Sequence, residues 1–245
     1  ERDICSKYIT PALQQSGWDL MDQVREEVTF TAGKIYIKGK KHARGKKKRA
    51  DYILYYKKNI PLAIIEAKDN NHLPGDGIQQ GLNYASILDI PFVFSSNGDS
   101  FVFHDKTISK EFNLDINNFP SPFELWSKYK NFKDIDSNNE KAITQDYFIE
   151  SSSYELRYYQ QIAINKSIEN IVNNKKQRLL LVMATGTGKT QVAFQIIYRL
   201  WKANIKKRIL FLADRTSLID QTMRNDFRHF KEAMTTIDNN NVSKA

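Results

Sequence analysis

Apolar and polar positions follow one rhythm over the first half of the chain and another rhythm over its last third. In the first half, short runs rich in β-branched and aromatic residues alternate with turn residues, a pattern that predicts strands. Strands are expected over residues 24–31, 34–37, 50–56, 62–67, 92–95 and 101–104. Helices are expected over 4–15, which Pro11 interrupts and Gly17 ends, and over 77–88. Together these elements predict a mixed sheet with flanking helices.

In the last third, very apolar runs alternate with amphipathic helices. Strands are expected over 178–183 and 208–213, and helices over 157–172, 189–202 and 218–230. Strand–loop–helix–strand–helix order predicts a parallel, doubly wound α/β unit. The residues between the two parts are polar and rich in Asp, Asn and Ser. We therefore expect a first domain over 1–135, a linker over 136–153 and a second domain over 154–245.

The charge of the chain favours a polyanionic partner. Lys and Arg outnumber Asp and Glu by 37 to 28, a formal net charge of +9 over 245 residues. Nucleic acid is the commonest polyanion that a basic protein meets. The single cysteine, Cys5, cannot form an internal disulfide and fits a cytoplasmic location, and the four histidines lie too far apart for a zinc site. The longest aliphatic run is far too short to span a membrane.

A glycine-rich loop between an apolar strand and an amphipathic helix is the sharpest motif of the sequence. Its nucleotide-binding residues are expected to be Thr185, Gly186, Thr187, Gly188, Lys189 and Thr190. The glycines let backbone N–H groups turn onto phosphate oxygens, and the helix N-terminus adds its dipole. Lys189 can reach the β- and γ-phosphates of ATP, and Thr190 can ligate Mg²⁺. Met183 stands where the general pattern has a glycine.

Two flanking segments resemble motifs of superfamily 2 helicases. Leu156-Arg-Tyr-Tyr-Gln160 resembles the adenine-reading Q motif, so Gln160 is the expected adenine contact. Residues 211–221 resemble the next helicase motif, which touches the DNA backbone, and match it at Arg215 and Gln221. No acidic Walker B cluster and no second motor domain follow. We therefore expect a truncated first RecA-like motor domain that binds nucleotide weakly and does not hydrolyse ATP.

Two carboxylates and one lysine lie on the predicted hairpin of the first domain. Asp51 opens one strand, and Glu66 and Lys68 close the next, two residues apart and therefore on one face. Asp51 and Glu66 can bind Mg²⁺ and leave ligand positions for water and phosphate. The metal would activate a water and neutralise charge on the scissile phosphate, and Lys68 could position that water. The other interpretation is that Glu66 and Lys68 form a surface ion pair.

The arrangement Asp…Glu-x-Lys resembles the PD-(D/E)xK nuclease superfamily, although Arg49-Ala50 replaces the proline that often precedes the first Asp. Gln80 and Tyr84 lie four residues apart on the expected helix and match the Gln-x-x-x-Tyr motif of RecB-like nucleases. The resemblance implies that both residues support the site and contact DNA. A third acid could come from one of three glutamates, and the sequence leaves the choice open among Glu1, Glu26 and Glu27.

A basic run stands immediately before Asp51. Residues 38–49 contain eight Lys or Arg in twelve positions. We expect this run to grip the DNA backbone close to the scissile phosphate. The residues nearest the site are Lys46, Lys47, Lys48 and Arg49. The alternative is a solvated hairpin without a ligand.

A RecB-like nuclease followed by a superfamily 2 motor resembles the R subunit of type I restriction enzymes over nearly the whole chain. The resemblance implies a Mg²⁺- and ATP-dependent enzyme that cleaves double-stranded DNA in a bacterial or archaeal cytoplasm. Its implied partners are a methyltransferase subunit and a specificity subunit. No association with a membrane is implied. Two alternatives stay open: another nuclease–helicase fusion in repair or phage defence, and a non-catalytic DNA-docking or assembly module.

Overall fold

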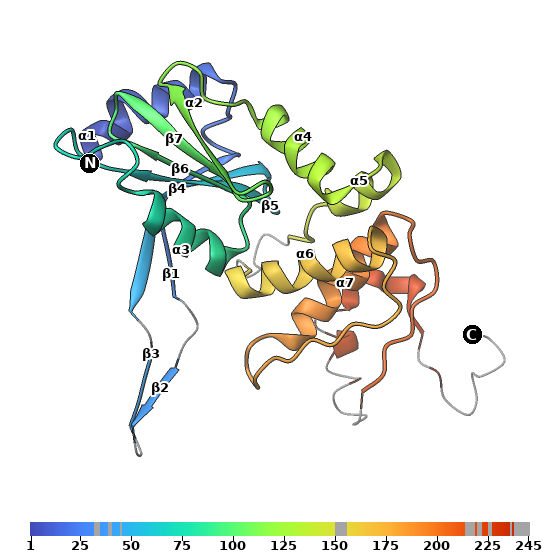
Figure 1. The fold of residues 1–245 in the computed structure, drawn as a ribbon. Coiled ribbons are helices and arrows are strands. Elements are labelled where there is room, and N and C mark those ends of the chain that lie inside the picture. The colour runs from blue at the N-terminus through green and yellow to red at the C-terminus, as the bar shows by residue number, and fades with distance from the viewer. Residues whose placement is uncertain are drawn as a thin grey trace.

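The computed structural model describes residues 1–31, 35–38, 41–44, 46–149, 156–213, 219, 222–224, 227–235 and 237. Its central element is a six-stranded mixed sheet with the order β1-β4-β5-β6-β7-β8 (Figure 1). The strands are β1 (Val24–Thr31), β4 (Lys47–Lys57), β5 (Ile60–Ala67), β6 (Phe92–Ser96), β7 (Ser100–Asp105) and β8 (Lys110–Asp115). All neighbours pair antiparallel except β5 and β6, which helix α3 (Ile78–Leu88) connects as a parallel crossover.

Helices cover both faces of this sheet. On one face lie α1 (Arg2–Ile4), the π-helical turn η1 (Cys5–Ile9) and α2 (Thr10–Gln15), which pack with Leu54 and Ile65. On the other face α3 packs with Ile53 and Ile64. Successive side chains of a strand point to opposite faces, so each central strand feeds both cores. This explains why β5 is buried almost throughout. The predicted mixed sheet with flanking helices is confirmed.

The interruption expected at Pro11 is a wide helical turn rather than a break. Pro11 has no N–H to donate within the helix, and the chain before it widens so that the Thr10 N–H bonds to the Cys5 carbonyl. The helical path therefore runs from Arg2 to Gln15. It ends near Gly17, which takes a left-handed φ of 85°.

Strands β2 (Ile35–Lys38) and β3 (Lys41–Arg44) form a separate two-stranded ribbon between β1 and β4. In Figure 1 this ribbon projects away from the main sheet as an arm. It holds the predicted strand near 34–37 and much of the basic run 38–49. Strand β8 and helix α4 (Pro122–Lys133) had no counterpart among the expected elements.

The expected linker over 136–153 contains helix α5 (Ser137–Ile143). Asp136 caps this helix by accepting hydrogen bonds from the backbone N–H groups of Asn138 and Asn139. The polar composition therefore partly reflects a helix cap and an exposed helix face. Ala142 and Ile143 are buried and contribute to the larger core cluster.

In the second part, helices α6 (Tyr158–Val172) and α7 (Lys189–Lys202) form as predicted. The two expected strands, over 178–183 and 208–213, do not form within the residues that the structure describes. Their aliphatic side chains stay exposed, with Val182 at 87% and Leu212 at 79%. An apolar run becomes a strand only when neighbouring strands supply its backbone hydrogen bonds. This prediction was therefore wrong for the chain as it stands.

The helix expected over 218–230 falls partly outside the described residues. Those that are described include one helical stretch at 222–224 and a 3₁₀ turn, η2 (Arg228–Ala233). No helix in the described part of the chain is long and apolar enough to cross a membrane.

Candidate functional site

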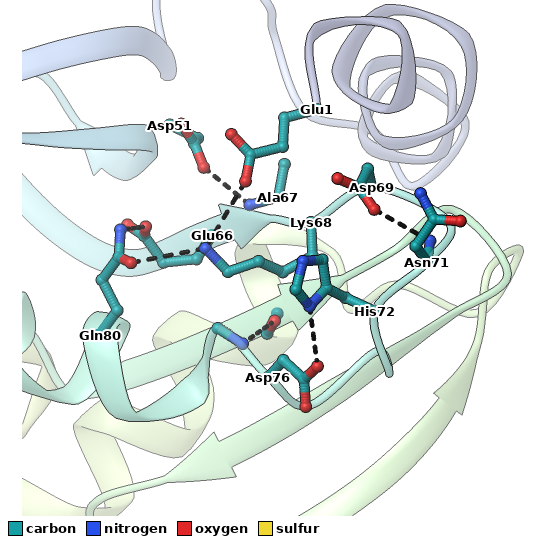
Figure 2. Close-up of polar contacts among 12 residues, drawn as sticks. Glu1, Asp51, Glu66, Ala67, Lys68, Asp69, Asn71, His72, Asp76 and Gln80 are labelled. Atoms are coloured by element: carbon teal, nitrogen blue, oxygen red, sulfur yellow. Dashed lines mark hydrogen bonds and ion pairs between the residues drawn. The ribbon is translucent and has the colours of Figure 1, made fainter.

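The pairing of β4 with the end of β5 brings the two predicted carboxylates together (Figure 2). Tyr52 pairs with Ile65 across these antiparallel strands, which places Asp51 beside Glu66. The Asp51 Oδ2 atom accepts a hydrogen bond of 2.8 Å from the Ala67 N–H. This bond fixes the Asp51 carboxylate at the end of β5, where the candidate site begins.

Glu66 is fully buried and only half satisfied. Its Oε2 atom accepts a short hydrogen bond from the Gln80 Nε2 atom, while its Oε1 atom has no hydrogen-bond partner among the described residues. Burial, followed by the nearby charge of Asp51, raises the pKa of Glu66 to about 8. Burial also raises the pKa of Asp51, against the lowering effect of the Ala67 N–H bond. A buried carboxylate oxygen without a donor is costly, and either a proton or a bound cation at this oxygen would remove that cost.

The donor set fits a hard divalent cation that keeps several waters. Within the described residues, no cluster of three or more His, Cys, Asp or Glu is arranged to hold a metal ion. Asp51 and Glu66 offer two carboxylates at one place in the fold. Mg²⁺ is commonly bound by one or two carboxylates together with waters and substrate phosphates. The pair therefore suits Mg²⁺ better than it suits an all-protein cage.

Lys68 shares the face of Glu66. Its side chain is mostly buried, and its Nζ atom lies 3.4 Å from the Gln80 Oε1 atom and 3.7 Å from the Glu1 Oε1 atom. Gln80 therefore bridges the Glu66 carboxylate and the Lys68 ammonium from one helix position, as Figure 2 shows. Lys68 is a member of the buried constellation and not a surface ion pair with Glu66.

Two glycines let α3 lie close enough for Gln80 to reach Glu66. A Cβ atom at Gly77 would lie 2.9 Å from the Glu66 Cβ atom, and one at Gly81 would lie 2.5 Å from the Val93 Cγ1 atom. Both approaches are too short for any larger residue without movement of the helix. The role of these glycines was not predicted from the sequence, although two glycines four residues apart on a helix, on either side of Gln80, indicate a close helix contact.

Tyr84 lies one helical turn beyond Gln80 and has one aromatic and one cationic neighbour. Its ring meets the Phe30 ring edge-on at 5.2 Å, and the Lys48 Nζ atom lies 5.1 Å from its centroid. Burial, followed by the charges of Glu66 and Asp51, raises the pKa of Tyr84. The predicted set of Asp51, Glu66, Lys68, Gln80 and Tyr84 is thus gathered at one place in the fold.

Of the three candidate acids, the structure brings Glu1 to the site. It contacts Lys68, and its charge raises the pKa of Asp51. Glu26 lies opposite Tyr52, whose hydroxyl bonds to Thr10 on the α2 face of the sheet. Glu27 forms an exposed ion pair with Arg49 at 3.5 Å.

The described end of the basic run stands beside this site. Lys46, Lys47 and Arg49 are exposed, and Lys48 is the partly buried residue that covers the Tyr84 ring. The first three residues of β4, all basic, therefore carry positive charge from the base of the arm almost to Asp51. This arrangement suits a polyanion that runs along the arm and into the site.

The glycine-rich loop leads directly into α7 and contacts Gln160 of α6. Gly188 caps α7 in a left-handed conformation, φ 83°, and a Cβ atom there would collide with the Gln160 amide. Lys189 is turned back, with its Nζ atom 3.2 Å from the Ala184 carbonyl oxygen. Gln160 donates to the Thr187 carbonyl oxygen at 3.0 Å. The predicted adenine reader thus contacts the loop itself, and Arg215 lies outside the described residues.

The six-stranded mixed sheet with helices on both faces, together with the matches of the two parts of the chain to known proteins, is consistent with a restriction-endonuclease-like domain joined to part of a RecA-like domain. Residues 38–112 match the family described as "Type I restriction enzyme R protein N terminus", and residues 153–245 match "Type III restriction enzyme, res subunit".

Individual relatives agree with these matches. The chain is 51% identical over its whole length to the EcoAI type I restriction enzyme endonuclease subunit of Escherichia coli, and covers 31% of it. It is 28% identical, over 71% of the chain and 18% of the relative, to the EcoKI subunit of strain K12. A solved HsdR-subunit fragment from Vibrio vulnificus YJ016 matches with a TM-score of 0.71 and 41% identity, over 83% of this chain and 38% of that one. The chain belongs to the R-subunit family of type I restriction enzymes, and it spans about a third of the EcoAI subunit.

Proposed function

We propose that the first domain is a Mg²⁺-dependent DNA endonuclease and that the second part binds ATP as the start of a DNA translocase. One observation carries the nuclease proposal: among the described residues, one oxygen of the buried Glu66 carboxylate has no hydrogen-bond partner, beside Asp51 and Lys68. Structural ion pairs are normally satisfied by hydrogen bonds on every side. An uncompensated carboxylate with a raised pKa in such a cluster is a mark of function.

Each residue has a distinct task in this proposal. Asp51 and Glu66 would hold Mg²⁺, which when bound supplies Lewis-acid charge and lowers the pKa of a bound water. Lys68, held by Gln80, positions the attacking water and faces the scissile phosphate. Gln80 orients the Glu66 carboxylate through its amide. Glu1 balances the Lys68 ammonium at the open side of the site.

The substrate follows from the surface around the site. Lys46, Lys47, Lys48 and Arg49 would contact the phosphate backbone of double-stranded DNA. The R-subunit family supports a complex with methyltransferase and specificity subunits, acting on DNA in the cytoplasm. A non-catalytic docking role predicts that the same residues bind DNA without metal, and this separates the two functions.

The nucleotide proposal rests on the loop that precedes α7. Thr185 to Gly188 would wrap the phosphates of ATP, Lys189 would swing from the Ala184 carbonyl to the β- and γ-phosphates, and Thr190 would ligate a second Mg²⁺. Hydrolysis requires groups that position the attacking water and stabilise the leaving phosphate. We expect this chain to bind ATP weakly without turning it over.

Calorimetric titration with Mg²⁺ or Mn²⁺ tests the nuclease proposal without requiring cleavage. Asp51→Ala should lose at least the roughly 10–100-fold in affinity that even an outer-sphere partner is worth, whereas Lys68→Ala should largely keep the metal. Glu111→Gln removes an exposed carboxylate on β8, is the matched control and should bind like the unaltered chain. Absence of metal binding, even with DNA present, would overturn the assignment in favour of the docking role.

A further inference from the structure

The first turn of α6 contacts the glycine-rich loop and the nuclease domain at the same time. Toward the loop, the Tyr159 hydroxyl and the Gln160 amide both donate to the Thr187 carbonyl oxygen, at 3.3 Å and 3.0 Å. Toward the nuclease domain, the Tyr158 hydroxyl donates a short hydrogen bond to the Thr31 carbonyl oxygen. Figure 1 shows this end of α6 beneath α3, close to where the arm leaves the sheet. Three consecutive residues thus join two predicted sites.

On the nuclease side, Tyr158 is connected to helix α3 through one intervening side chain. Its ring meets the buried Phe30 ring edge-on at 6.4 Å, and Phe30 meets Tyr84 at 5.2 Å. Tyr84 lies one turn beyond Gln80, the residue that holds Glu66. The packed rings of Tyr158, Phe30 and Tyr84 therefore form a continuous path from α6 to the site.

Tyr158 also holds the base of the basic arm. Thr31 is the last residue of β1 and pairs with Lys47, the first residue of β4, while Phe30 pairs with Lys48. The lysine at 48 is the one that covers Tyr84. A change in the Tyr158 hydroxyl bond would therefore be felt by the DNA-facing lysines and by the catalytic helix together.

On the loop side, nucleotide binding has to rearrange groups that α6 contacts. Lys189 is bonded to the Ala184 and Met183 carbonyl oxygens and has to leave them to reach a phosphate. The Gln160 amide lies against Gly188, where even a Cβ atom would collide, so the loop cannot shift there without moving Gln160. One helical turn is stiff, and a displacement at Gln160 reaches Tyr158.

We propose that Tyr158 couples occupancy of the glycine-rich loop to DNA binding at the arm and the nuclease site. This inference rests on the proposed function, because it requires that the chain bind both a nucleotide and DNA. Coupling between two sites is reciprocal: each ligand changes the affinity of the other by the same factor. The role of Tyr158 is therefore measurable from binding alone.

The test uses the 245-residue chain, a fluorescent non-hydrolysable ATP analogue and a DNA duplex, with Ca²⁺ in place of Mg²⁺. The dissociation constant of the analogue is measured with and without saturating duplex. In the unaltered chain the two values should differ by about 5-fold or more, the lower end of typical coupling factors. Tyr158→Phe, which loses only the bond to Thr31, should bring the ratio at least halfway to one on a logarithmic scale. Tyr158→Ala should bring it to one.

Tyr129→Phe is a matched control. The Tyr129 hydroxyl also joins the first part of the chain to α6, through Glu169, but at the end remote from the loop and the arm. This variant should keep the full ratio. Thermal unfolding of each variant verifies that Tyr158→Phe keeps the native fold, so the proposal does not depend on the more disruptive alanine.

The outcomes separate this proposal from the function on which it rests. If the analogue or the duplex fails to bind on its own, the proposed function fails and the coupling fails with it. If both ligands bind and the dissociation constant of the analogue is the same with and without duplex, the coupling alone is overturned. An unchanged ratio in both Tyr158 variants, or an equal loss in Tyr129→Phe, would overturn the assignment to Tyr158.

Discussion

At the scale of single residues, the Glu66 carboxylate has a cost that depends on pH. Its pKa rises from 4.5 to about 8 because burial and Asp51 disfavour the charged form. Between these values the folded chain holds a proton that the unfolded chain has released, so stability falls as the pH rises through this window. Below the lower value both states are protonated and the cost vanishes. The Glu66 carboxylate is thus expected to destabilise the fold at neutral pH.

Glu66→Gln should remove this cost. The neutral amide needs no counter-charge, so the variant should be more stable than the unaltered chain by about 1–3 kcal/mol near pH 8. The gain should shrink toward zero near pH 4.5, the lower end of the window. Urea denaturation at both ends of the window measures it, with Glu111→Gln as the exposed control. Equal gains at the two pH values would show that the carboxylate charge is not the cause.

At the scale of secondary-structure elements, much of the first domain was readable from the sequence. Strand β1 and helix α7 have the predicted bounds. Helix α7 carries apolar residues at helical spacing, whereas Glu27, with a left-handed φ of 51°, interrupts the alternation of β1. Strand β8 was missed because most of its residues are exposed at the sheet edge and carry no alternation. The sequence could not single out Glu1 among the three candidate acids because its position beside Lys68 depends on how α1 docks, a tertiary contact without a local signal.

The polar network around Arg199 shows how the elements of the second part attach to the first. This α7 side chain is buried and donates to the Asn165 Oδ1 atom at 2.7 Å and to the Ile143 carbonyl oxygen at 2.6 Å. Asn165 in turn donates to the Asn59 carbonyl oxygen in the β4–β5 turn, at 2.7 Å. Arg199 therefore connects α5 and α6 directly and, through Asn165, connects them to the turn between β4 and β5. Burial lowers the pKa of Arg199 to about 10, still far above neutral pH.

Arg199→Met should separate these elements. The substitution keeps the apolar stem but removes the Arg199 donor from the buried Ile143 carbonyl oxygen, while the Asn165 Oδ1 atom keeps the Tyr147 hydroxyl as a donor at 3.0 Å. We expect a loss of about 1–3 kcal/mol in urea denaturation, the cost of one buried group left without its donor. Lys202→Met, an exposed position near the end of the same helix, is the control and should change stability little. Similar stabilities for the two variants would contradict the role of the network.

At the scale of the whole molecule, positive charge is concentrated where the arm joins the proposed nuclease site. The chain carries a net charge of +9, and the lysines at 46–48 follow the arm directly into β4. If these lysines contact phosphates, each contact releases counterions when DNA binds, and the affinity depends steeply on salt. A lysine that only adds to the net charge contributes weakly, because salt screens it within about 10 Å. Salt dependence therefore distinguishes contact from general attraction.

Replacing the three lysines at 46–48 by glutamine should weaken duplex DNA binding and lower the slope of log K against log[salt] by about one for each lost phosphate contact. The charge-matched control replaces Lys175, Lys176 and Lys207, which are exposed in the second part of the chain. Both triple variants lose three positive charges, so a long-range effect of net charge would shift both slopes equally. A contact surface at the base of the arm requires the slope to fall only in the first variant. Fluorescence anisotropy over a salt series measures both slopes, and equal slopes would show that the lysines at 46–48 do not contact DNA phosphates.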